Sequence, residues 1–175
     1  MKLHLGCGID KKAGYVNIDR SDQVNPDLVW DLEETPLPFE DNSITEVVAN
    51  HVFEHLYNFV PLMHDLRRIC VPGAKIKIKV PFYSTWGQYN DPTHVRFFSP
   101  FTFNYFQKGN YSHEVECKDN MFKINKVKIN FGIGRASKLN WIMNPIINLH
   151  HAFYCRFAAW IIPSSEIEFE LEVLK

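Results

Sequence analysis

Seven short segments of this chain have the pattern of β-strands, and several of them alternate between apolar and polar residues with a period of two. The segments are residues 2–5, 15–19, 27–31, 44–50, 75–80, 123–131 and 166–174. Apolar residues alternate with three lysines in 75–80 and with four glutamates in 166–174. A strand that is buried on both faces is apolar throughout, so alternation predicts a two-layer protein whose sheet has one largely solvated face. If these strands are neighbours, a row of lysines faces a row of glutamates there.

Apolar residues spaced three and four apart predict two helical segments, and Ser99-Pro100 predicts the start of another, shorter one. These are residues 52–70, which Pro72 and Gly73 terminate, a shorter segment from Ser99 to about Phe106, and one within 139–162 that Pro145 starts or breaks. Ten residues separate Gly8 from Asp19, and seven separate Asp19 from Asp27. Parallel strands normally need a crossover of about a dozen residues or more. We therefore predict that the helices after the first two strands are missing.

The composition is that of a globular protein, and 175 residues suggest a single domain. A net charge of −1 gives no basic excess, which argues against nucleic acid as a main partner. Cys7, Cys70, Cys117 and Cys155 are widely spaced and form no C-x-x-C pair. They therefore match neither a zinc site nor a redox motif, and we expect a reduced, cytoplasmic protein without a signal peptide.

The segment 139–162 is rich in Ile, Phe and Trp, but it also contains asparagines, histidines and Arg156. An arginine near the middle of a membrane span costs about 2.5–3.5 kcal/mol, so we expect no transmembrane helix. A helix at a membrane interface, a homodimer contact, a cap on the active site and additional cover for the sheet all stay open.

The chain begins with a strand that runs directly into Gly6-Cys7-Gly8. Glycine adopts backbone torsions that side chains forbid, and it lets a ligand approach the main chain closely. An acidic residue, Asp19, stands at the end of the next predicted strand. A glycine turn after one strand and an acidic residue after the next are typical of a nucleotide-type cofactor site.

Further motifs follow in an order that resembles the class I S-adenosylmethionine-dependent methyltransferases. They are Asn17-Ile18-Asp19, Asp31-Leu32-Glu33, Leu37-Pro38-Phe39-Glu40-Asp41-Asn42-Ser43, Phe53-Glu54-His55-Leu56 and Arg68-Ile69-Cys70-Val71-Pro72-Gly73-Ala74. The resemblance implies a small, trimmed α/β protein with a Rossmann-like sheet of order 3-2-1-4-5-7-6 and an antiparallel last strand. We expect one methyltransferase domain over 1–175, with a helical insertion at about 133–164.

The resemblance also implies the cofactor, S-adenosylmethionine, and its binding residues. Gly6, Cys7 and Gly8 would approach its methionine and ribose. Asp19 would accept hydrogen bonds from the ribose hydroxyls, and Asp31 and Leu32 would flank the adenine. Asn50 and His51 would line the methionine end. The chain departs from the family pattern at His4, where an acidic residue is common, and at Asp10, which replaces the third glycine. We expect no metal, because the acidic residues do not cluster at ligand spacing.

The long loop 81–96 follows the fifth strand, at the sheet edge where ligands bind in open α/β folds. Its segment Asp91-Pro92-Thr93-His94-Val95-Arg96 resembles one in methyltransferases that act on sugars or cell-surface precursors. His94 is our candidate for the base or the residue that orients the acceptor, and Arg96 would hold an anionic part of the substrate. Equally, both residues could only pin the loop.

His55 is the second catalytic candidate, unless it only makes hydrogen bonds at a helix start. Tyr83, Trp86 and Tyr89 are candidates for an aromatic substrate wall or for cover of the core edge. We therefore expect methyl transfer from S-adenosylmethionine to a small polar molecule, such as a sugar or cell-surface precursor.

Two other functions stay open. A methyltransferase fold without activity would bind the cofactor or a partner chain only. A zinc hydrolase would use His51, Glu54 and His55, which match the motif H-x-x-E-H. That motif belongs inside a helix, whereas here it crosses from a predicted strand end to a predicted helix start.

Overall fold

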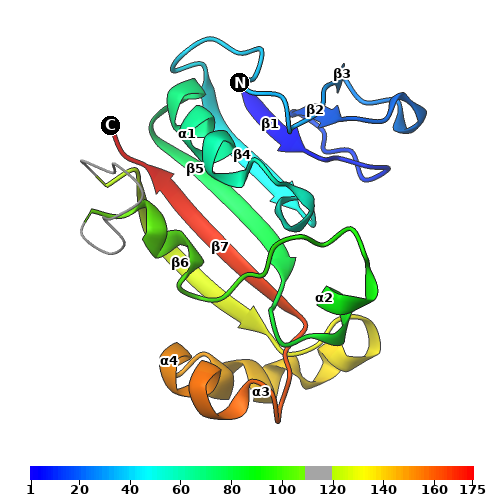
Figure 1. Cartoon of the computed structure of the whole chain (residues 1–175), viewed down its shortest axis with the longest axis vertical. Coiled ribbons are helices and arrows are strands. Elements are labelled where there is room, and N and C mark those ends of the chain that lie inside the picture. Colours follow the sequence, from blue (N-terminus) through cyan, green and yellow to red (C-terminus); the bar gives the residue numbers. More distant parts are fainter. Residues whose placement is uncertain (109–119) are drawn as a thin grey trace.

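One seven-stranded sheet organises the part of the chain that the structure describes, residues 1–108 and 120–175 of a computed structural model (Figure 1). Its strand order is β3-β2-β1-β4-β5-β7-β6, and β7 is antiparallel to both β5 and β6. The strands are β1 (Lys2–Leu5), β2 (Val16–Asp19), β3 (Leu28–Val29), β4 (Ile44–Asn50), β5 (Cys70–Pro81), β6 (Phe122–Asn130) and β7 (Glu166–Val173). The predicted fold class, strand order and final antiparallel strand are confirmed. β3 is shorter than predicted, and β5 begins earlier.

The two faces of the sheet differ in chemistry. On one face, phenylalanines from α1 (Phe59–Ile69) and the 3-10 helix η3 (Thr102–Phe106) contact each other, and Phe103 also contacts Phe169 of β7. On the other face, Lys75, Lys77 and Lys79 of β5 stand opposite glutamates of β7, and lysines of β6 flank the same glutamates. The predicted lysine and glutamate rows are therefore neighbours. This confirms the two-layer arrangement.

Only short connections join the first three strands. Residues 6–15 and 20–27, all of them described, contain turns and one 3-10 helix, η1 (Asp22–Val24). The missing crossover helices are thus confirmed for this part of the chain. The carboxyl ends of β1 and β2 consequently carry no helical cover there.

The predicted helix over 52–70 is wrong at its beginning. A 3-10 helix, η2 (Phe53–His55), is followed by an extended Leu56, and α1 starts at Phe59. Side chains from other segments form hydrogen bonds with the backbone N–H and carbonyl groups of residues 56–58, which a continuous helix would pair internally. The Glu33 carboxylate accepts hydrogen bonds from the N–H groups of Tyr57 (2.7 Å) and Asn58 (2.9 Å). The Arg96 guanidinium donates to the carbonyl oxygens of Leu56 (3.3 Å) and Tyr57 (3.2 Å).

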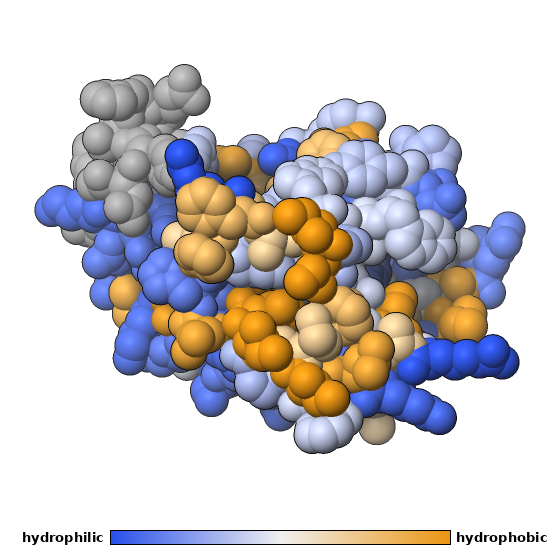
Figure 2. Space-filling view, turned by 90° about the horizontal axis from the view of Figure 1, so that it is seen from below, coloured by the Kyte–Doolittle hydropathy of each residue, from blue (hydrophilic) through white to orange (hydrophobic). Residues whose placement is uncertain are grey.

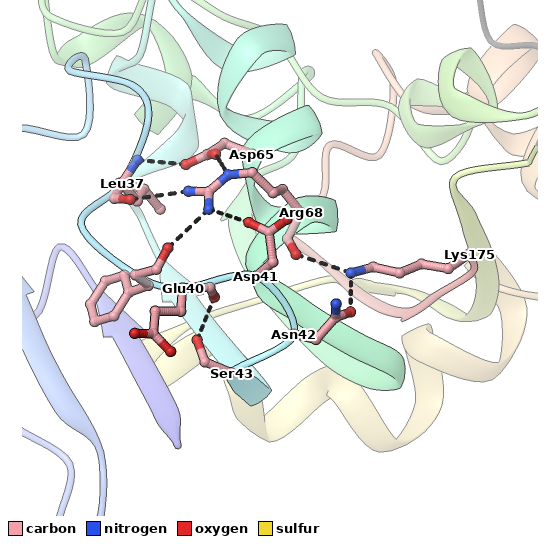
Figure 3. A network of polar contacts seen from close by, with 9 residues as sticks. Leu37, Glu40, Asp41, Asn42, Ser43, Asp65, Arg68 and Lys175 are labelled. Atoms are coloured by element: carbon pink, nitrogen blue, oxygen red, sulfur yellow. Dashed lines mark hydrogen bonds and ion pairs between the residues drawn. The ribbon is translucent and has the colours of Figure 1, made fainter.

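A polar network around Arg68 holds the segment 37–43 against α1 (Figure 3). Arg68 donates to the Asp65 and Asp41 carboxylates at 2.6 and 2.7 Å, and to the carbonyl oxygen of Leu37 at 3.1 Å. Asp65 in turn accepts the Leu37 N–H at 2.6 Å. Lys175 donates to Asn42 and to the carbonyl oxygen of Arg68. The segment from Leu37 to Ser43, a specific part of the sequence resemblance, therefore has a structural role.

Short helices lie between β6 and β7: η4 (Gly134–Leu139), α3 (Asn140–Ile147), α4 (His151–Phe153) and the π-helical turn η5 (Tyr154–Ala158). Pro145 lies inside α3, so the prediction that it starts or breaks the helix is wrong. The segment opened by Ser99 and Pro100 forms the 3-10 helix η3 rather than an α-helix. No helix among the described residues is both long and apolar enough to cross a membrane.

Three asparagines fasten α3 and the residue after it to the edge of the sheet. Asn140, Asn144 and Asn148 are spaced four apart and lie on one side of the helix. The side-chain oxygens of these asparagines accept, in the same order, the backbone N–H groups of Gly132 (2.8 Å), Phe131 (2.9 Å) and Ile129 (2.7 Å). These three residues lie at and just beyond the end of β6. An edge strand presents unpaired backbone groups, and these side chains satisfy some of them.

Candidate active site

A pocket of about 220 Å³ opens where β1, β2 and β4 end. It is lined by Gly6, Asp19, Arg20, Trp30, Asp31, Leu32, Glu33, His51, Val52, His55, Leu56 and Thr93. Ligands of open α/β sheets bind at this edge, outside the carboxyl ends of the strands. Five predicted cofactor residues line the pocket, namely Gly6, Asp19, Asp31, Leu32 and His51.

The glycine turn and Asp19 form one side of this pocket together. Gly6 and Gly8 have φ angles of 56° and 50°, in the left-handed region that glycine tolerates. The two Asp19 carboxylate oxygens accept the N–H groups of Gly8 at 2.8 Å and Ser21 at 3.0 Å. A carboxylate has about four acceptor positions, so Asp19 retains capacity for a ligand.

Three other predicted cofactor residues lie outside the pocket lining. Cys7 is buried, and burial raises the pKa of its thiol. Gly8 contacts the site through its bond to Asp19. Asn50 lines a separate cavity with Lys77, Lys79 and Glu168 on the charged face of the sheet. Successive side chains of a strand point to opposite faces, which explains why Asn50 and His51 line different cavities.

Several pocket residues were missed by the sequence reasoning. Trp30 directly precedes Asp31, and its indole donates to the carbonyl oxygen of Glu34 at 3.1 Å. Glu33 lines the pocket and also binds the backbone just before α1. Thr93 lines the pocket from the loop after β5, which is distant in the sequence. Trp30 could have been found as an aromatic residue at a predicted strand end. Thr93 has no comparable signal, because only the tertiary structure brings it to the pocket.

His51 is fixed between two carboxylates. It has a φ of 54°, and its Nε2 and Nδ1 lie 2.8 Å from Glu166 and 3.3 Å from Glu54. The hydrogen bonds to Glu166 and then Glu54 raise the pKa of His51 to about 9. His51 is therefore cationic at neutral pH, and both ring nitrogens are engaged. The H-x-x-E-H motif crosses from the end of β4 into η2, so the helical geometry of the zinc hydrolase motif is absent here.

The two predicted catalytic histidines lie side by side. The ring centroids of His55 and His94 are 4.7 Å apart. His55 lines the pocket, whereas His94 is not among its lining residues. His94 Nδ1 donates to the carbonyl oxygen of Gln88 at 3.0 Å, and His55 Nδ1 lies 2.9 Å from the Thr93 hydroxyl. His94 thus helps to hold its loop and also faces the other histidine.

The predicted substrate-binding residues do not line this pocket. The Arg96 guanidinium lies 4.9 Å from the Phe59 ring centroid and bonds Leu56 and Tyr57, so its contacts are those of loop pinning. Tyr83 donates to the carbonyl oxygen of Cys155 at 3.0 Å. Trp86 and Tyr89 are exposed, and Tyr89 donates to the Tyr83 carbonyl oxygen. The structure does not assemble the three aromatic residues around the pocket.

Comparison with known proteins agrees with this geometry. A family model described as a methyltransferase domain matches residues 3–78. No curated protein matches the sequence. Among solved structures, a SAM-dependent methyltransferase from Archaeoglobus fulgidus has a TM-score of 0.66 at 16% identity, over 98% of this chain and 85% of that one. A second, from Mesorhizobium loti, has a TM-score of 0.59 at 11% identity, over 98% and 89%.

The [4+2]-cyclase SpnF is also similar, with a TM-score of 0.61 at 13% identity over 98% of this chain and 74% of that one. Such identities establish the fold, and the presence of a cyclase shows that the fold alone does not specify the reaction. The strand order, the glycine turn bonded to Asp19 and the matching family model agree on one assignment. Residues 3–78 match a methyltransferase domain, and the described residues have the Rossmann-like fold of the class I S-adenosylmethionine-dependent methyltransferases.

Proposed function

We propose that this chain transfers a methyl group from S-adenosylmethionine to a small polar acceptor. The observation that carries the proposal is the Asp19 carboxylate, which bonds the glycine turn and lines the pocket. The match of residues 3–78 to a methyltransferase domain supports the same cofactor.

The pocket residues fit this cofactor chemically. Asp19 and Asp31 offer carboxylate oxygens for ribose hydroxyls and adenine, while Leu32 and Trp30 offer apolar and aromatic surface. Asp19, Asp31 and Glu33 outnumber the cations Arg20 and His51 in the lining. This acidic excess favours a ligand with a positively charged sulfonium. When bound, the cofactor supplies the methyl group.

His55 and His94 are the residues that we propose to position the acceptor. His55 reaches the pocket, and Thr93 beside it belongs to the segment that resembles enzymes of sugar and cell-surface precursor methylation. On that resemblance we propose a sugar or a related cell-surface precursor as acceptor. Alignment of acceptor and methyl donor can supply a large part of the rate enhancement.

Calorimetric titration with S-adenosylhomocysteine tests the cofactor site. We expect the wild-type chain to bind it and Asp19→Ala to lose binding, while Asp22→Ala, an acidic residue outside the pocket, binds like wild type. Equal binding by Asp19→Ala and wild type would contradict the proposed site. Binding without turnover, when S-adenosylmethionine is offered with a set of sugar acceptors, would instead support the inactive binding protein.

A further inference from the structure

We propose that Glu54, His55 and His94 bind a divalent transition-metal ion beside the pocket. One ligand atom from each of these side chains lies within 4.8 Å of the other two. Glu54 and His55 belong to η2, and His94 comes from the loop after β5. Two imidazoles and one carboxylate form the donor set of many catalytic zinc sites.

The hydrogen bonds of both histidines use Nδ1, which leaves Nε2 as the ligand atom of each neutral imidazole; the Asp91 carboxylate lies 3.9 Å from His94 Nε2. His94 Nδ1 must carry a proton, because its partner at 3.0 Å is the Gln88 carbonyl oxygen, which can only accept. The Thr93 hydroxyl donates to Asp91 at 2.6 Å, so it accepts from His55 Nδ1 at 2.9 Å. Metal-binding histidines commonly donate their other ring N–H to such outer partners, which fix ring orientation and tautomer.

Glu54 provides an independent observation. Its side chain is 1% exposed, and Oε2 has no hydrogen-bond partner, while Oε1 contacts His51. A buried, unpaired carboxylate oxygen is energetically costly, and a metal ion would satisfy it. The Glu54 carbonyl oxygen also accepts the N–H groups of Val95 (2.9 Å) and Arg96 (3.1 Å). These bonds hold the loop that carries His94 against η2.

The site departs from the sequence-based expectation of no metal, because His94 joins the pair from a distant loop. An ion beside His55 would act as a Lewis acid that binds an acceptor hydroxyl and lowers its pKa. Metal binding itself does not depend on the proposed methyl transfer, so the two can fail separately.

Calorimetric titration of the EDTA-treated full chain with Zn²⁺ alone tests the site, with Co²⁺ absorption as a second readout. We expect one ion per chain. Loss of an outer partner in Thr93→Val should weaken binding by about 10–100-fold, and loss of a ligand in His94→Ala should weaken it further. His64→Ala, on α1, is the matched control and should bind like wild type. Circular dichroism checks that each variant is folded.

Absence of Zn²⁺ binding by the folded wild-type chain would overturn the proposal. Equal affinity of His94→Ala and wild type would overturn it as well, because the ion would then be held elsewhere.

A different observation carries a second proposal, concerning the surface over residues 133–162. Eleven large apolar side chains are exposed there (Figure 2), with Trp141 at 78% and Leu149 at 85%. They are Ile133, Leu139, Trp141, Ile142, Ile146, Leu149, Phe153, Phe157, Trp160, Ile161 and Ile162. A contiguous apolar surface of this kind marks an interaction site.

α3 exposes most of its apolar side chains, unlike a helix packed on a sheet, and Ile147 is its one buried residue. Its asparagines face the edge of β6, whereas Trp141, Ile142 and Ile146 are exposed. An amphipathic helix in a globular protein normally buries its apolar stripe. Here polar bonds hold the helix in place, and the apolar side is free for a partner.

The charges indicate which partner. Arg135, Lys138 and Arg156 are exposed within the apolar surface, and residues 133–162 contain no acidic residue. A two-fold dimer would bring identical cationic surfaces together, which is unfavourable. Aromatic and aliphatic side chains beside cations fit the interface of an anionic membrane. We infer that this surface docks on anionic lipid.

The surface lies at the end of the molecule toward which β1, β4 and β5 point (Figure 1). Tyr83, which follows β5, contacts Trp160 with ring centroids 5.5 Å apart. This inference rests on the proposed function only in one respect: a membrane-anchored acceptor would be presented to the pocket side of the chain.

Co-sedimentation with vesicles tests the surface in the full chain. We expect binding to phosphatidylcholine vesicles that contain phosphatidylglycerol, weaker binding to phosphatidylcholine alone, and loss of binding in the double variant Trp141→Ser, Trp160→Ser. Tyr57→Ser removes an exposed aromatic residue elsewhere and should bind like wild type. No binding to either vesicle would overturn the proposal, as would a dimer in light scattering that the double variant dissociates.

Discussion

Gly6 connects the backbone of the first turn to the shape of the pocket. Its φ is positive, and a Cβ built on it would lie 2.2 Å from Val52 Cγ2. Valine is β-branched and cannot easily rotate away. Gly8 has a similar φ, but a Cβ there would meet no atom within 4 Å. The two glycines are therefore required for different reasons.

A comparison of Gly6→Ala with Gly8→Ala separates these reasons. Both variants should lose about 1–2 kcal/mol of unfolding free energy from the left-handed backbone. Gly6→Ala should lose about 1–3 kcal/mol more through overpacking against Val52. Urea denaturation of the two variants and wild type measures the difference. Equal losses would show that Val52 moves aside at little cost.

Neighbouring elements, rather than helix propensity, decide where α1 begins. Glu33 and Arg96 interrupt the helical pattern at 56–58.

On the charged face of the sheet, Glu46 of β4 forms ion pairs with Lys2 of β1 (2.9 Å) and Lys77 of β5 (2.6 Å). The hydrogen bonds to Lys77 and then Lys2 lower the pKa of Glu46 to about 2.

This pKa predicts an acid-dependent contribution to stability. The folded-state pKa lies below the ordinary value of 4.5, so the contribution is present above pH 4.5 and is lost as the pH falls toward 2. The two lysines are 47% and 48% exposed, so screening limits it to about 1 kcal/mol. Urea denaturation should show Glu46→Gln less stable than wild type at pH 7, with the difference shrinking below pH 4.5. A difference that is constant with pH would contradict the assignment.

At the scale of the whole molecule, the two-layer construction leaves the pocket without crossover helices on one side. The loop after β5 and η2 close the other side, and their mutual bonds bring Thr93 and His55 together. The short helices between β6 and β7 then place an apolar surface at the same end of the molecule (Figures 1 and 2). The locations of the pocket and of the apolar surface thus depend on the lengths of the connections between strands.

The sequence by itself determined the strands, their solvated face, the absent crossover helices and the glycine turn with Asp19. Each of these follows from a local pattern: the periodicity of apolar residues, the spacing between predicted strands or the placement of glycines. The tertiary structure alone decided where α1 begins, which side of α3 faces the sheet, and that His94 joins Glu54 and His55. These depend on hydrogen bonds between residues far apart in the chain, such as those of Arg96 with Leu56 and of Asn148 with Ile129, and local pattern contains no record of such pairings.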